Sequence, residues 1–330
     1  MFRKTLLLTL LIALLLAGCA PASILTEAPV SSPQAAPVST ESPLTEAPVD
    51  AAILFTDSLG REVKLAAPAQ RVVSLAPSLT EILFAIGAGS QVVGRDEYSD
   101  YPEQALDVES IGSTYQTLNT EAILALDPDL VVAAGINSPE QIKDLEDLGV
   151  VVYFFGNPVD FGGMYQHLEI MGELTGHAQE AGALVESLKV RVLAVEEIIT
   201  PLSYQPTVFY EIDSTDTTKP WTSGPGTFMD TMIAMAGGIN IGGVLSDSFA
   251  QISLEEIILQ DPDFIILGDA KWGATIESIG QRPGWESLSA VNNEKIFVFD
   301  DDLASRPGPR LVDGLEALVA ILHPEFAPAP

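Results

Sequence analysis

The sequence contains one cysteine and three histidines in 330 residues. A disulfide needs two cysteines and a thiolate metal site needs several, so neither forms within this chain. His167, His177 and His323 form no cluster with carboxylates, and we expect them on the surface by default. Receptors for bare zinc or manganese need such clusters, so the sequence predicts no metal site of that kind.

Basic residues are scarce: 15 Lys and Arg stand against 46 Asp and Glu, and the formal net charge is −31. Nucleic acid and anionic lipid headgroups repel such a surface, which argues against nucleic acid as a partner. It favours a soluble body whose protein partners carry basic patches. Beyond the N-terminus, no apolar run is long enough to span a membrane.

Enzyme motifs are also absent, since GxSxG, HExxH, a Walker loop and GxGxxG do not occur. The segment TSGPG contains Ser223, but no histidine is placed to serve it, and a ligand loop is the better interpretation. We therefore predict a protein that is not an enzyme and has no catalytic residues and no cofactor. A cell-surface enzyme or scaffold is the rival class.

The N-terminus has the form of a bacterial lipoprotein signal. Arg3 and Lys4 precede an apolar run that ends in LLAGC. We predict a signal peptide over 1–18, cleavage before Cys19 and lipidation of that cysteine, which would anchor the protein outside the cytoplasm. Residues 19–52 are rich in Pro, Ala, Ser and Thr, cannot bury a core, and are predicted to be a disordered tether. Which membrane holds the anchor is left open.

One stretch occurs twice, as TEAILALDPDLVV (120–132) and LEEIILQDPDFII (254–266). Each copy has a glutamate, Glu121 or Glu255, then an apolar run of helical spacing that stops at Asp-Pro, and then a β-rich segment. The alternative is that the two copies are unrelated, because a helix followed by Asp-Pro-Asp and a strand is a common unit in parallel sheets. A second shared pattern, a helix that ends in glycines, precedes each copy, and Thr80 is the expected cap of the first such helix.

These repeats predict two α/β lobes with a ligand cleft between them. We place the N-terminal lobe at 53–158 and the C-terminal lobe at 201–330, each Rossmann-like. Residues 159–200 carry one apolar helical face with Gly176 as the only weak point, and are predicted to be a long, rigid connecting α-helix. Ligands of such sheets bind beyond the carboxyl ends of the strands.

The chain resembles the iron-chelate and vitamin B12 periplasmic binding proteins of ABC importers, which are class III substrate-binding proteins. The resemblance covers about residues 53–323 and rests on RVVSLAPSLTEILFAIGAG, VVGRDEYSDYP and LNTEAILALDPDLVV. The segments YSDYP, TSG and SRPGPR agree best with the vitamin B12-binding members. The resemblance implies a monomer that binds a corrinoid (cobalamin or cobinamide) and delivers it to an ABC transporter permease.

The same resemblance implies which residues face the ligand. Tyr115 and Phe249 stand where the B12-binding members have tryptophan, which leaves the exact ligand open. Core packing is the alternative for the aromatic residues, and an ion pair with one of the many acids is the alternative for the arginine. The implied ligand-binding residues are Tyr98, Tyr115, Trp221, Phe249, Asp302 and Arg306.

Glu121 and Glu255 match two surface glutamates with which family members dock onto arginines of the permease. One carboxylate per lobe suits a two-fold symmetric transporter. The alternative is that each glutamate is a favourable charge in the first turn of a helix.

The ligand class rests on charge. An acidic chain suits a nearly neutral corrinoid better than a strongly anionic ferric siderophore, and a siderophore remains the alternative. Haem, with tyrosine as an axial ligand, is also left open.

Overall fold

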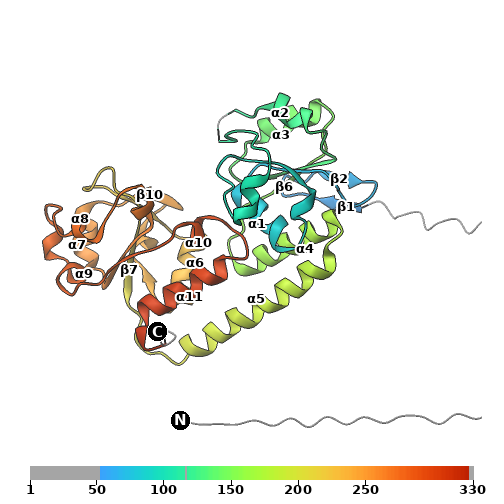
Figure 1. Ribbon diagram of the computed structural model, residues 1–330. Coiled ribbons are helices and arrows are strands. Elements are labelled where there is room, and N and C mark those ends of the chain that lie inside the picture. Colours follow the sequence, from blue (N-terminus) through green and yellow to red (C-terminus); the bar gives the residue numbers. More distant parts are fainter. Residues whose placement is uncertain (1–52, 116, 327–330) are drawn as a thin grey trace, which may run out of the picture. The chain divides into compact units, whose positions relative to one another are not determined.

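The computed structural model describes residues 53–115 and 117–326, which belong to one compact unit (Figure 1). The predicted signal peptide, Cys19 and the tether lie outside the described residues. Within the described part of the chain, no helix combines the length and the apolar character needed to cross a membrane.

The first lobe opens with the predicted hairpin, β1 (Ile53–Thr56) paired antiparallel with β2 (Glu62–Leu65). Gly60 has a φ of +78°, which a glycine adopts without steric cost. The Asp57 carboxylate accepts the amide protons of Leu59 and Arg61 at 3.0 Å each and so closes the turn.

A parallel four-stranded sheet follows, in the order β4-β3-β5-β6. Its strands are all short and largely buried, as expected where helices cover both faces of a parallel sheet. The strands are β3 (Val72–Ser74), β4 (Val92–Arg95), β5 (Leu130–Ala134) and β6 (Val152–Phe155), and the helices are α1 (Pro77–Ala85), α2 (Thr120–Ala125) and α3 (Pro139–Asp147).

The predicted cap of the first helix was wrong. Helix α1 begins at Pro77, whose fixed φ suits a first helical position, and its N-cap is Ala76. Thr80 therefore lies inside the helix, fully buried, where its hydroxyl bonds to Ser74 Oγ at 2.8 Å and Ser99 Oγ at 3.0 Å.

The second lobe contains a sheet in the order β10-β8-β7-β11-β12, with β9 paired to the start of β7. Its strands are β7 (Thr207–Asp213), β8 (Trp221–Ser223), β9 (Ile239–Asn240), β10 (Phe249–Gln251), β11 (Phe264–Leu267) and β12 (Ile296–Val298). Its helices are α6 (Phe228–Met235), α7 (Leu254–Gln260), α8 (Ile276–Ile279), α9 (Ser289–Asn292), α10 (Asp302–Ser305) and α11 (Leu311–Leu322).

The repeat is visible in this topology. The parallel order β4-β3-β5-β6 recurs as β9-β7-β11-β12, and the antiparallel strands β8 and β10 are the addition in the second lobe. Asp127 and Asp261, each before a proline, have φ of +46° and +44° and end their helices. Asp129 then accepts the amide proton of Arg71 at 2.9 Å, and Asp263 that of Thr207 at 2.8 Å, so each copy ties itself to the start of the neighbouring strand.

The segment between the sheets differs from the prediction of one helix. It contains two helices, α4 (Phe161–Thr175) and α5 (Ala178–Ile199), which pack against each other. Gly176 ends α4 with a φ of +80°, a left-handed conformation that only glycine takes readily, so the weak point in the pattern is a turn. A Cβ on Gly172 would lie only 2.6 Å from Ala181 Cβ, so a glycine is needed at this contact between the two helices.

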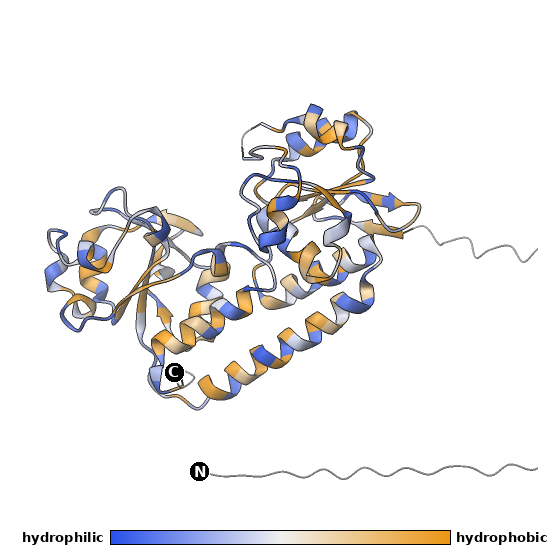
Figure 2. Ribbon diagram, viewed as in Figure 1, coloured by the Kyte–Doolittle hydropathy of each residue, from blue (hydrophilic) through white to orange (hydrophobic). Residues whose placement is uncertain are grey.

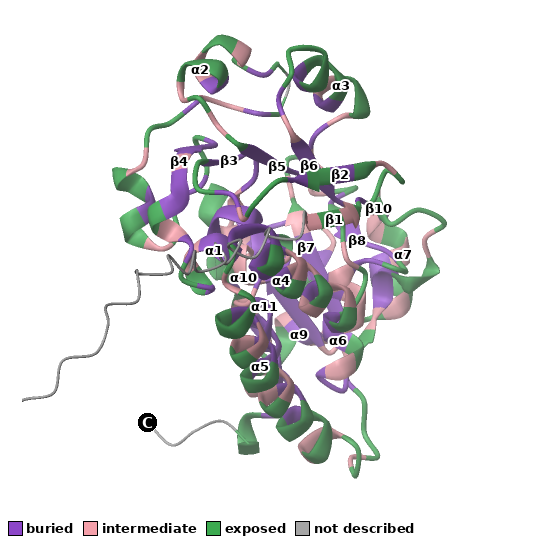
Figure 3. Cartoon of the chain, turned by 90° about the vertical axis from the view of Figure 1, so that its right-hand side faces the viewer, coloured by how far each residue is buried: buried purple, intermediate pink, exposed green. Residues whose placement is uncertain are grey.

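The core joins both lobes. One face of each sheet packs into a common cluster that includes α4, α5 and α11. The other face of the first sheet is covered by α2 and α3, and that of the second by α7, α8 and α9. Figures 2 and 3 show the central strands of the two sheets, such as β5 and β7, as apolar and largely buried. The predicted fold class, α/β with two Rossmann-like lobes linked by helix, is thus confirmed.

The histidines are less exposed than predicted. His323 is buried, and its Nε2 lies 3.0 Å from the carbonyl oxygen of Ala236. His167 packs edge-on against Phe155 with ring centroids 5.0 Å apart, and burial lowers its pKa to about 4. The surface assignment was wrong for His323, because this residue caps the C-terminal end of α11 and its ring contacts the buried end of α6 at Ala236.

Candidate ligand and docking sites

Two of the predicted ligand aromatics meet in the first lobe. Tyr98 follows β4 and Tyr115 precedes α2; their rings lie perpendicular with centroids 6.1 Å apart. The residues are 49% and 65% exposed, too much for core packing. Their position beyond the carboxyl end of β4 is where ligands of parallel sheets bind.

A buried carboxylate holds these two loops together. Asp96 Oδ1 accepts the Tyr98 amide proton at 2.9 Å, and Asp96 Oδ2 accepts the Thr114 hydroxyl proton at 3.2 Å. Asp96 is fully buried, and the loss of solvation raises its pKa, although these bonds oppose the rise. Because Thr114 directly precedes Tyr115, the Asp96 side chain positions both Tyr98 and Tyr115.

The other two aromatics lie in the second lobe, on the added antiparallel strands. Phe249 of β10 is opposite Ser223 of β8, and Gln251 is opposite Trp221, so the two aromatics share one face of the pair. They are 60% and 43% exposed. Two of the four predicted ligand aromatics are therefore exposed on each lobe.

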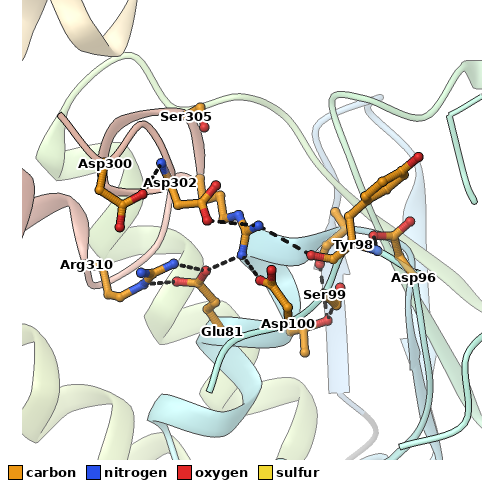
Figure 4. A network of polar contacts seen from close by, with 12 residues as sticks. Glu81, Asp96, Tyr98, Ser99, Asp100, Asp300, Asp302, Ser305 and Arg310 are labelled. Atoms are coloured by element: carbon orange, nitrogen blue, oxygen red, sulfur yellow. Dashed lines mark hydrogen bonds and ion pairs between the residues drawn. The ribbon is translucent and has the colours of Figure 1, made fainter. Parts of the chain in front are cut away.

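Arg306 and Asp302 belong to an ion-pair cluster that crosses between the lobes (Figure 4). Arg306 Nη1 lies 2.6 Å from Asp100 Oδ1 and 3.3 Å from Glu81 Oε1, and Nη2 lies 3.2 Å from Asp302 Oδ2. Asp302 also pairs with Lys271 at 3.0 Å. Arg306 is only 9% exposed. The structure therefore shows Arg306 in ion pairs with acids.

Glu81 and Arg310 complete the cluster and were missed by sequence reasoning. Glu81, 2% exposed, accepts two bonds from Arg310, Nε at 2.8 Å and Nη2 at 2.6 Å. The Arg310 guanidinium also lies over the Tyr101 ring, 3.9 Å from its centroid. Burial raises the pKa of Glu81, while its two arginines act in the opposite direction. The one sequence signal that could have identified Glu81 as a buried, paired carboxylate is its position inside the apolar helical run LTEILF.

The cluster is balanced in formal charge. Its carboxylates are Glu81, Asp100 and Asp302, and its cations are Lys271, Arg306 and Arg310. Every one of these cations already has a carboxylate partner. An anionic ligand would have to compete with those carboxylates.

The two predicted docking glutamates occupy equivalent positions. Glu121 and Glu255 are exposed and lie in the first turns of α2 and α7, whose N-cap side chains, Asn119 and Ser253, each accept a backbone amide proton at 3.1 Å. A first-turn carboxylate is favourable in both helices. The geometry suits that role and the docking role equally.

Other features lie away from these residues. Hollows of about 490 and 420 Å³ run along α4 and α5 and are lined by residues such as Tyr165, Leu193 and Glu196, without any predicted ligand residue. Across residues 53–115 and 117–326, no three His, Cys, Asp or Glu side chains are grouped so that they could hold a metal ion.

The chain belongs to the periplasmic binding protein family, whose sequence profile matches residues 72–303. An uncharacterised ABC transporter substrate-binding lipoprotein of Bacillus subtilis, YvrC, is 30% identical over 278 residues, which is 83% of this chain and 86% of the relative. A vitamin B12-binding protein of Vibrio cholerae is 30% identical over 261 residues, 77% of this chain and 90% of that protein. The predicted resemblance is confirmed.

A solved structure shows the same fold. The periplasmic heme-binding protein RhuT from Roseiflexus sp. RS-1, in its apo form, has a TM-score of 0.70 and 27% identity, and the match covers 78% of this chain and 98% of that one. The predicted class III fold is therefore confirmed. The family consists of extracytoplasmic substrate-binding proteins of transport systems.

Proposed function

We propose that this protein is an extracytoplasmic lipoprotein that binds a corrinoid, cobalamin or cobinamide, and delivers it to an ABC importer without chemical change. The match to a vitamin B12-binding protein supports the ligand class. The sequence LLAGC supports lipidation of Cys19 after removal of residues 1–18, with 19–52 as the tether. The lobes are proposed to span 53–158 and 201–330, with 159–200 between them.

The observation that carries the ligand assignment is that the predicted ligand aromatics are exposed as one pair on each lobe. A corrin is a flat, partly apolar macrocycle with amides around its rim, and aromatic walls with a few polar groups suit it. Tyr98 and Tyr115 would contact it from the first lobe, and Trp221 and Phe249 from the second. Asp302 and Arg306 would supply polar contacts at the rim.

Charge favours this ligand over the two alternatives. A ferric siderophore of high negative charge, or the propionates of haem, would meet cations that are already paired with carboxylates. Tyrosine binds haem iron as an anion, but the neighbouring Glu97 carboxylate raises the pKa of Tyr98 and so disfavours its ionised form. A neutral corrinoid needs neither an unpaired cation nor a tyrosinate.

For the partner, we propose a permease with one basic socket for each lobe. Glu121 and Glu255 are exposed at equivalent helix positions, so a two-fold symmetric transporter could bind both glutamates at the same time. The symmetry of the repeat supports this role beyond the favourable helix charge that each glutamate supplies.

A calorimetric titration tests the ligand directly. The mature chain from residue 20 onward, which lacks the lipidated cysteine, is titrated with cyanocobalamin, cobinamide, a ferric hydroxamate, a ferric catecholate and haemin. We expect one-to-one binding of a corrinoid. Binding of an iron chelate or haemin alone would leave the fold and family intact and overturn the corrinoid assignment.

A further inference from the structure

Glu81 is a buried carboxylate of the first lobe whose partners are two arginines of the second. Arg310 donates two hydrogen bonds to the Glu81 carboxylate, from Nε at 2.8 Å and from Nη2 at 2.6 Å. This bidentate geometry is the strong form of an arginine–carboxylate pair. Arg306 approaches the same carboxylate at 3.3 Å. Both arginines lie in the segment SRPGPR between α10 and α11.

Arg306 in turn contacts Tyr98, one of the proposed ligand-binding aromatics. Its Nη1 pairs with Asp100 at 2.6 Å, and its Nη2 lies 3.4 Å from the carbonyl oxygen of Tyr98. The amide of the same tyrosine is held by Asp96. The Tyr98 backbone is therefore fixed from both lobes, by Asp96 on one side and by Arg306 on the other (Figure 4).

We infer that Glu81 is a positioning residue that sets the spacing between the two lobes at the ligand site. Through Arg306 and Arg310 it holds residues 302–310 of the second lobe against residues 98–101 of the first. It thereby fixes the separation between the tyrosine pair and the pair Trp221 and Phe249. The effect on ligand affinity rests on the proposed function, whereas the effect on lobe spacing does not.

The energetics favour such a role for Glu81 over its exposed neighbours. A carboxylate removed from water is stable only when its charge is compensated, and here both compensating charges come from the other lobe. Separation of the lobes would leave Glu81 without either arginine and Arg310 without its carboxylate, whereas Arg306 would keep only Asp302. Asp100, by contrast, is half exposed and can be solvated when its contact breaks.

The chain offers a matched control. Glu211 is fully buried and pairs with Arg282 at 2.5 and 2.9 Å, but both residues lie in the second lobe. Glu81→Gln and Glu211→Gln therefore each remove the charge of one buried carboxylate that is paired with arginine. Loss of stability alone would affect both variants, whereas a change in lobe spacing would follow only from Glu81→Gln.

The experiment measures the distance between spin labels on the two lobes. Labels are attached through Glu121→Cys and Glu255→Cys in the mature chain from residue 20 onward, where no other cysteine occurs. We expect the distance distribution to broaden in Glu81→Gln and to stay that of the parent in Glu211→Gln. Hydrogen exchange in residues 98–101 and 302–310 should rise in the first variant alone.

Cyanocobalamin affinity, measured without the labels, gives the second readout. We expect Glu81→Gln to weaken binding about tenfold, which corresponds to about 1.4 kcal/mol, and Glu211→Gln to leave it unchanged. If Glu81→Gln fails to fold, Asp100→Asn removes the charge from the 2.6 Å contact at a half-exposed position and should broaden the distribution relative to the parent; a parent-like distribution would then overturn the role of this cluster.

The outcomes separate the two claims. A parent-like distance distribution and unchanged exchange in a folded Glu81→Gln variant would overturn the positioning role. If the parent binds no corrinoid, the proposed ligand fails, and the distance measurement still decides whether Glu81 sets the spacing.

Discussion

The ring of Tyr98 meets the ring of Tyr115 edge to face, with centroids 6.1 Å apart, although the two residues come from different loops. Such a pair is more favourable than its buried area alone, because the positive edge of one ring faces the negative face of the other. Both rings are nevertheless largely exposed. Their mutual contact does not fill the core, and under the proposed function it would preorganise an apolar wall for the ligand.

Truncation of either ring should therefore weaken the binding of a corrinoid. We expect Tyr98→Ala and Tyr115→Ala each to cost about 1–2 kcal/mol, or roughly a five- to thirtyfold rise in Kd, as is typical of buried aromatic anchors. Calorimetry with cyanocobalamin measures the change. The control is Tyr204→Ala, which removes a similarly exposed tyrosine between α5 and β7. Equal losses in all three variants would point to a general effect on the fold.

Charge reversal at the two proposed docking positions should separate transport from ligand binding. In cells, the double variant Glu121→Arg with Glu255→Arg should abolish uptake, because two repulsive contacts would face the basic sockets of the permease. The affinity of the purified protein for its ligand should stay unchanged. Glu197→Arg, on the exposed side of α5, reverses the charge away from both helices and should retain uptake. Loss of ligand affinity in the double variant would contradict the docking role.

Stability should fall in mild acid because of His167. Its pKa in the folded protein, about 4, lies below the usual value of 6.5, because burial disfavours the charged ring. The stabilisation is therefore present above pH 6.5 and is lost as the pH falls towards 4, by up to about 3 kcal/mol. Denaturant unfolding at pH 7 and pH 4.5 should show a smaller difference for His167→Gln than for the parent.

Local signals in the sequence were sufficient for much of this fold. The Asp-Pro stops, the glycine ends of helices and the apolar strands act over a few residues, so both copies of the repeat and the hairpin were predictable. The turn at Gly176 was not, because a glycine in a helical pattern costs only about 1 kcal/mol and can be tolerated. Only the packing of α4 on α5 decides in favour of the turn.

The candidate site was predictable in part. The aromatics and acids could be located from short motifs, but the partners of Arg306 could not, because Glu81 lies more than two hundred positions away in the chain. The sequence around a single glutamate such as Glu81 does not indicate which distant arginine it pairs with. The balance between a ligand-facing arginine and a paired one depends on the three-dimensional arrangement of the lobes.

Ligand binding should be accompanied by small movements of the lobes. The two sheets share a continuous apolar core through α4, α5 and α11, so wide hinge opening would expose part of that core to water. The ion pairs of Glu81 oppose separation as well. Small-angle scattering of the mature chain from residue 20 onward, with and without cyanocobalamin, should therefore give nearly the same radius of gyration. A large decrease in the radius of gyration on ligand addition would contradict this prediction. It would show that the lobes move about a hinge despite their shared core.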